Sequence, residues 1–82
     1  EGHGGKMVDD GVTEIGGRRP VNVDGGLICK GEPVGASGFG QIHEMCLQLR
    51  DVSGPRQVEG AKVGLCQVFG SMGHGTVSIL KK

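Results

Sequence analysis

The residue types that could do chemistry gather in residues 22–48, where a glycine-rich loop runs into an amphipathic pattern. Ser37 is placed to cap a helix there, and Gly38 and Gly40 leave room for close backbone approach in its first turn. The unpaired N–H groups and the positive dipole end at a helix start suit an anion, an oxyanion or a thioester carbonyl. Loops lead into helices in most folds, so the same stretch also fits an ordinary structural corner, and both interpretations stay open.

Histidine and cysteine are the other reactive residue types, and their spacing predicts no metal site. His3, His43 and His74 stand far apart, and the three cysteines include no C-x-x-C pair, so none of the usual zinc patterns is present. An odd number of cysteines argues against a disulfide framework and for a reducing compartment. We expect Cys46 and Cys66 to be small buried hydrophobic side chains, and His43 to be structural or exposed.

The clearest predicted element is the helix that follows the glycine-rich loop. Apolar residues recur at helical spacing over 36–49, Arg50 suits a helix C-terminus, and Ser-Gly-Pro at 53–55 ends the pattern. The expected apolar stripe comprises Phe39, Ile42, Met45, Cys46 and Leu49.

Three strands are expected to pack with this helix. Val21 and Val23 alternate with polar neighbours and predict the first strand. Residues 62–69 predict a second strand with apolar side chains on both faces, and a glycine-rich turn joins it to a third at 76–80 as an antiparallel hairpin. The resulting β-α-β-β order places the chain in the mixed α/β class, as an α+β fragment. One helix covers only one face of such a sheet, so these elements predict a subdomain that needs a neighbour.

Length, composition and charge limit the function. The 82 residues suffice for one small domain, in which 1–20 form a loop-rich lead-in with short extended pieces at 6–8 and 12–15, and 21–82 form the strand, the helix and the terminal hairpin. Nine basic and nine acidic side chains cancel, and no apolar run reaches the length of a membrane span, so we expect neither nucleic acid nor membrane as a partner. A start that is not Met is consistent with a fragment, and an ending in two lysines, without a peroxisomal signal, makes a cytoplasmic location the default.

Residues 22–38, NVDGGLICKGEPVGASG, resemble the N-x-x-GG…GHPxGA(S/T)G loop of the thiolase superfamily. Further along, residues 47–50, 54–58 and 60–63 and the glycine-rich hairpin resemble the sterol-carrier-protein type, also called lipid-transfer-protein thiolases. The lead-in looks like the segment before that loop. The resemblance therefore covers essentially the whole chain.

The resemblance implies the closing portion of the second half of a thiolase subunit, which is several times longer than this chain. It implies a CoA thioester as the substrate of the intact enzyme, no covalently bound cofactor, and the remainder of the subunit as the partner. A zinc-ribbon/OB-fold accessory protein works with some relatives of this type. The half that carries the nucleophilic cysteine is absent from these residues, so we expect no thiolysis or condensation by the 82 residues alone.

The resemblance also implies the site residues. Glu32 stands where the family has the catalytic histidine of its GHP motif, which accepts the proton of the nucleophilic thiol. A carboxylate has a low unperturbed pKa and needs desolvation to be a well-poised base, and His74 in the loop after the penultimate strand is expected beside it as an acid/base partner. The alternative is that His74 is an exposed turn residue and that Glu32 marks lost activity. The residues expected to form the corner that holds an oxyanion or thioester are Gly35, Ser37, Gly38, Gly70 and Gly73.

Three functional hypotheses remain. The first is an acyl-CoA-processing enzyme of acyl-transfer (thiolysis) or carbon–carbon cleavage type, and Glu32 shifts the weight toward a lyase-like member. The second is a non-catalytic structural or interaction module that self-associates through the faces that a missing half would cover. The third is a metal-binding protein that uses the histidines and cysteines.

Overall fold

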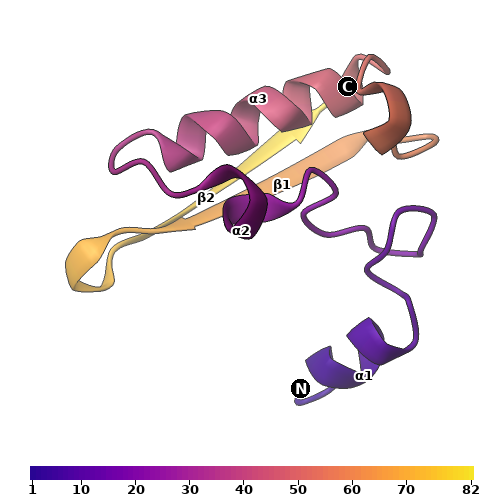
Figure 1. The fold of residues 1–82 in the computed structure, drawn as a ribbon, viewed down its shortest axis with the longest axis horizontal. Coiled ribbons are helices and arrows are strands. Elements are labelled where there is room, and N and C mark those ends of the chain that lie inside the picture. The colour runs from indigo at the N-terminus through magenta and orange to yellow at the C-terminus, as the bar shows by residue number, and fades with distance from the viewer.

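The computed structural model describes the backbone of residues 1–82 and every side chain except that of Ser71 (Figure 1). A helix with a sheet of two antiparallel strands forms its centre, and a long lead-in precedes them. The chain is therefore of mixed helix and strand composition, as an α+β fragment. The elements in chain order are α1 (Gly4–Asp9), α2 (Gly26–Lys30), α3 (Ser37–Leu49), a 3-10 turn (Gly54–Arg56), β1 (Val63–Phe69), a second 3-10 turn (Ser71–Gly73) and β2 (Gly75–Lys81).

The hairpin of β1 and β2 confirms the prediction for the end of the chain. Its register pairs Val63 with Lys81 and Phe69 with Gly75, and α3 lies along one face. Gly64 belongs to that face, and a Cβ there would stand 2.7 Å from the Met45 sulfur. The missing side chain therefore lets the strand approach the helix closely.

The helix predicted after the glycine-rich loop is confirmed as α3, but its cap is not the predicted one. Ala36 is the N-cap and Ser37 is the first helical residue. The Ser37 hydroxyl instead donates a hydrogen bond to the Pro33 carbonyl at 3.2 Å. The N–H groups of Ala36 and Ser37 also bind Pro33 O, so a turn already precedes the helix and shifts its start.

The predicted strand at 21–23 is wrong, because the chain turns there and enters α2. Asn22 has φ 50° and Gly25 has φ 93°, both in the left-handed region that ends extended structure. Asp24 then accepts a hydrogen bond from Gly26 N, which starts the helix. The alternation of Val21 and Val23 is a strand pattern, but these residues have no partner strand among those the structure describes.

The lead-in also departs from the prediction. The expected extended piece at 6–8 lies inside α1, and the one at 12–15 forms turns in which Val12 N binds Met7 O at 3.0 Å. α1 stands away from α3 and the hairpin (Figure 1). Glycine-rich sequence of this kind forms local turns because no long-range partner holds it extended.

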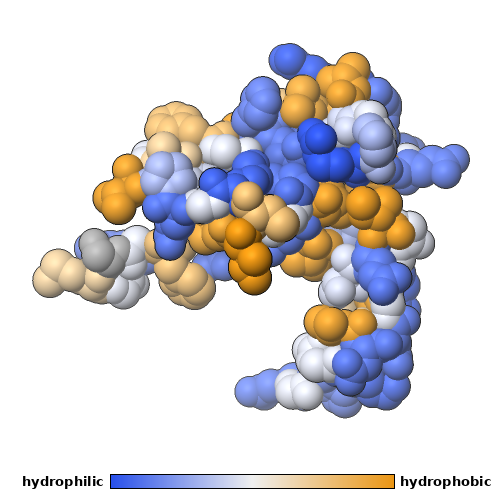
Figure 2. Space-filling model, in the orientation of Figure 1, coloured by the Kyte–Doolittle hydropathy of each residue, from blue (hydrophilic) through white to orange (hydrophobic). Residues whose placement is uncertain are grey.

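The apolar core is small. Among the described side chains, Leu49 and Cys66 are the buried apolar ones. Phe39, expected in the apolar stripe of α3, is 75% exposed, and Figure 2 shows apolar surface on the viewed face where α2 lies. The hairpin face turned away from α3 is uncovered, and its apolar members are Val63, Leu65, Phe69, Val77 and Ile79. We predicted that both faces of β1 are covered. Among the described residues, α3 covers one face and the other stays exposed.

Candidate functional site

A cavity of about 590 Å³ lies between the first half of α3 and the far end of the hairpin. Glu32 is its carboxylate, and glycines and apolar side chains make up most of the rest. The predicted site residues that line it are Glu32, Gly35, Ser37, Gly38 and Gly70. The structure therefore brings these residues from the loop, the helix and the hairpin around one space.

The loop before α3 sets the floor of this cavity. Gly31 (φ 78°) and Gly35 (φ 81°) both adopt the left-handed conformation, so the chain can turn on either side of Glu32. Gly38 then lies against β1, because a Cβ there would stand 3.5 Å from a methyl of Val68. The start of α3 therefore lies close to β1, and Glu32 lies on the loop at the edge of the cavity.

The hairpin turn forms the rim, with His74 beside it. Gly70 N donates a hydrogen bond to His74 O at 2.6 Å, so this N–H group is taken up within the turn. His74 and Gly73 do not line the cavity. In the part of the chain that the structure describes, no hydrogen bond or ion pair joins Glu32 to His74, so their pairing stays a prediction.

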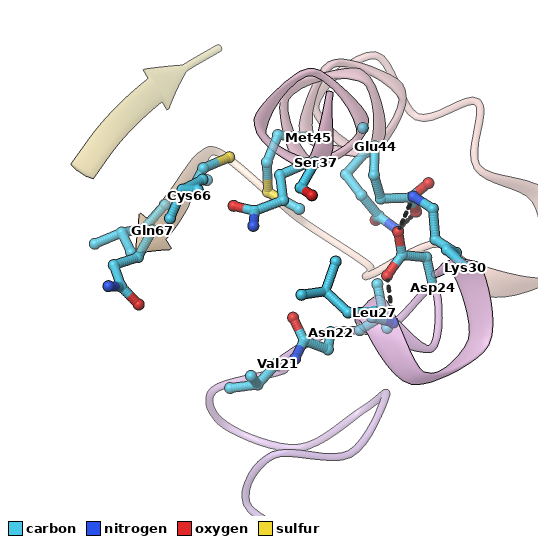
Figure 3. A pocket seen from close by; sticks show the side chains of 18 of the residues that line it. Val21, Asn22, Asp24, Leu27, Lys30, Ser37, Glu44, Met45, Cys66 and Gln67 are labelled. Atoms are coloured by element: carbon cyan, nitrogen blue, oxygen red, sulfur yellow. Dashed lines mark hydrogen bonds and ion pairs between the residues drawn. The ribbon is translucent and has the colours of Figure 1, made fainter. Parts of the chain in front are cut away.

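A larger cavity, of about 990 Å³, lies on the other side of the same loop, between α2, α3 and β1 (Figure 3). Glu32 and Ser37 line this cavity as well. The segment that carries Glu32 therefore lies between two cavities, directly after α2 in the chain.

An ion pair in the larger cavity supports α2. The Asp24 carboxylate accepts a hydrogen bond from Lys30 Nζ at 2.7 Å and one from Gly26 N at 3.0 Å. Burial alone would raise the pKa of Asp24, but the hydrogen bonds from Lys30 and Gly26 outweigh it and hold the pKa below its usual value. The carboxylate is therefore charged at neutral pH.

A second ion pair, which the sequence did not reveal, lies at the other end of α3. Glu44 is only 4% exposed and accepts bonds from Arg56 Nε at 3.2 Å and from a terminal Arg56 nitrogen at 3.1 Å. Gln48 donates to the same carboxylate at 3.0 Å. Burial raises the pKa of Glu44, but the hydrogen bonds from Arg56 and Gln48 together lower it by more. The pKa of Glu44 therefore lies below its usual value. In the sequence, the only sign of this buried cluster is the spacing of Glu44 and Gln48, which are four residues apart and so lie on the same side of the helix.

The three cysteines differ in burial: Cys29 is exposed, and Cys46, which was predicted to be buried, is half-buried. Cys66 is buried as predicted, and burial with nearby Cys46 raises the pKa of its thiol, which makes it less reactive. His43 is exposed. No group of three metal-binding side chains comes together among the described residues. Within the same residues, every helix is too short or too polar to cross a membrane.

Comparisons with known proteins cover the chain from end to end. The family model described as thiolase C-terminal domain-like matches residues 1–82. Sterol carrier protein 2 of Oryctolagus cuniculus is 48% identical over 81 residues, which are 99% of this chain and 15% of that protein. An acetyl-CoA acetyltransferase of Methanothermobacter thermautotrophicus is 46% identical over 79 residues, which are 96% of this chain and 20% of that protein.

A more distant relative completes the comparison. The benzoylsuccinyl-CoA thiolase subunit BbsB of Thauera aromatica is 37% identical over 71 residues, which are 85% of this chain and 18% of that protein. The chain thus spans no more than about a fifth of the length of these three relatives.

Proposed function

Because the chain belongs to the thiolase C-terminal domain-like family, we propose that residues 1–82 form the closing portion of a thiolase-like, acyl-CoA-processing subunit and are inactive alone. One observation carries the proposal. The family match spans the whole chain, yet the chain covers only 15% of the sterol carrier protein 2 relative. The small core and the uncovered hairpin face support it, because a self-sufficient domain would bury these side chains.

In the intact subunit, Glu32 would act as the proton acceptor. The residues around it form a cavity with glycines at the chain turns and apolar side chains from α3 and β1. The remainder of the subunit would close the open side and exclude water, and a desolvated carboxylate is the stronger base. Glu32 would then take the proton of the thiol that receives the acyl group, leaving a thiolate to attack the thioester.

A CoA thioester is the proposed substrate. The relatives include an acetyl-CoA acetyltransferase and a benzoylsuccinyl-CoA thiolase subunit, and both names refer to CoA thioesters. Acyl transfer by thiolysis and carbon–carbon cleavage both begin with a polarised thioester or ketone carbonyl, so a proton acceptor beside a helix start serves either. A reactive cysteine in the missing half would favour acyl transfer, and its absence would favour a lyase.

The activity test uses the full-length polypeptide that contains residues 1–82, with acetoacetyl-CoA and CoA as the probe substrates. Glu32→Gln should lower kcat about 100-fold or more, as expected for loss of a positioned base. Glu59→Gln is the matched control, because it makes the same chemical change at an exposed turn residue that lines neither cavity. A Glu32→Gln enzyme that keeps more than half of the wild-type kcat would contradict the proposed role.

A second candidate function, favoured by the uncovered hairpin face, is a non-catalytic module that self-associates. Leu65 and Ile79 are 61% and 68% exposed and stand directly opposite each other in the register. Such an apolar face can pair with a second copy of itself. Analytical ultracentrifugation of the 82-residue chain separates the two functions, since a monomer at high concentration would rule out the self-associating module.

A further inference from the structure

α2 directly precedes the segment that carries Glu32, and it is too short to be stable as an isolated helix. It has five residues, whereas isolated helices shorter than about 12 residues are marginal in water. Asp24 supports both of its ends. One carboxylate oxygen accepts the hydrogen bond from Gly26 N, at the first residue, and the other accepts the bond from Lys30 Nζ, at the last (Figure 3).

The same ion pair lies against α3. A Cβ at Gly40 would stand 3.7 Å from Lys30 Nζ, so the ammonium group rests on the surface of the first turns of that helix. The side chains of Asp24 and Lys30 are 14% and 42% exposed, which limits how far water can screen them. The ion pair itself joins two residues of the α2 segment, and its ammonium group lies next to the start of α3.

Close packing restricts the backbone at the start of α2. A Cβ at Gly25 would come within 2.5 Å of the Cys29 sulfur, so α2 is wound tightly over the residue before it. Only Gly31 separates Lys30 from Glu32. The direction in which the chain leaves α2 therefore decides where Glu32 stands.

We propose that Asp24, acting through Lys30, is a positioning residue that sets the place of Glu32 at the wall of the 590 Å³ cavity. This inference rests on the proposed function of Glu32. Asp24 and Lys30 do not themselves line that cavity, so they would act through the backbone of residues 31–37.

Variants of the full-length polypeptide test the proposal. Asp24→Asn keeps an oxygen for Gly26 N but removes the charge that holds Lys30, and Lys30→Met keeps the aliphatic stem. Both should lower kcat about 10-fold and change KM less than about 2-fold, because misplacing a catalytic group costs rate more than binding. Lys30→Arg should retain most of the rate. Lys6→Met is the control, since it breaks an ion pair of the same 2.7 Å length on α1.

A double-mutant cycle distinguishes positioning from a general loss of structure. In a Glu32→Gln background, Asp24→Asn should cause no further loss of kcat, because the group that it positions is gone. An equal loss in both backgrounds, or an unchanged kcat in Asp24→Asn alone, would overturn the inference.

Hydrogen exchange gives a readout that does not depend on catalysis. Asp24→Asn should accelerate amide exchange over residues 31–37, and Lys6→Met should not. Unchanged exchange there overturns the positioning role even if Glu32→Gln abolishes activity. If Glu32→Gln instead leaves activity intact, the proposed function of Glu32 is wrong. Accelerated exchange in Asp24→Asn would then still identify Asp24 as the residue that orders residues 31–37.

Discussion

Three acidic side chains line the larger cavity, and their surroundings give them different roles. Asp24 and Glu44 each lie beside a cation and accept further hydrogen bonds, so the oxygens of both carboxylates already have partners. Glu32 makes no hydrogen bond or ion pair with any described side chain. Glu32 is also exposed, so its carboxylate is free for the proton transfer that we propose.

The Glu44–Arg56 pair gives a prediction at the scale of single residues. In the full-length polypeptide, Arg56→Met should reduce the free energy of unfolding at pH 7, because it leaves a buried carboxylate short of its charged donor. The loss should be smaller in a Glu44→Gln background. Chemical denaturation of the four variants measures both values, and an equal loss in the two backgrounds would contradict the pairing.

The pH dependence of the same pair follows from the lowered pKa of Glu44. A carboxylate whose pKa is lower in the folded state contributes stability that is fully present above its usual pKa of 4.5 and lost as the pH falls through the folded value. The destabilisation by Arg56→Met should therefore shrink when unfolding is measured below about pH 4. A constant difference between pH 7 and acidic conditions would show that Glu44 does not carry the effect.

At the scale of elements, the fit of α3 on the hairpin depends on Gly64. Gly64→Ala would place a methyl group 2.7 Å from the Met45 sulfur, so the helix or the Met45 side chain must move. We expect a loss of about 1–3 kcal/mol in unfolding free energy, typical of an overpacked contact. Met45→Ala should relieve most of it. Gly5→Ala, at an open position of α1, serves as the control and should be neutral or slightly stabilising.

The elements that could be predicted from the sequence are those with a clear pattern in a short stretch of residues. The spacing of apolar residues over 37–49 and the turn between two β-rich runs both lie within short windows, and the structure has α3 and the hairpin there. Most of the predicted corner residues also meet around one cavity, because the loop, the helix start and the hairpin turn lie at the same end of the molecule.

What could not be predicted depends on contacts that are recognisable only once the elements are known. Asp24 and Lys30 are recognisable as a pair only once α2 is known, and the strand alternation of Val21 and Val23 gave no hint of it. Arg56 reaches Glu44 from a loop 12 residues away. Phe39 and Ile42 have the pattern of core residues, but 75% and 38% of their surfaces stay exposed.

At the scale of the whole molecule, the exposed apolar faces are the main feature. One side of the hairpin carries Val63, Leu65, Phe69, Val77 and Ile79, and each of them is at least 60% exposed among the residues that the structure describes. Covering them would remove several hundred Å² of apolar surface from water and contribute about 25 cal/mol for each Å². A remainder of the subunit in that position would complete the core on this side of the hairpin.

Thiol labelling of Ile79→Cys tests this account most directly. The variant is made in the full-length polypeptide in a Cys29→Ser background, and Glu59→Cys, at an exposed turn, is the reference. If the rest of the polypeptide covers the hairpin face, a maleimide should label position 79 at least about 100-fold more slowly than position 59, because reaction then requires local opening. Equal labelling rates at the two positions would contradict the claim that these residues complete a larger fold.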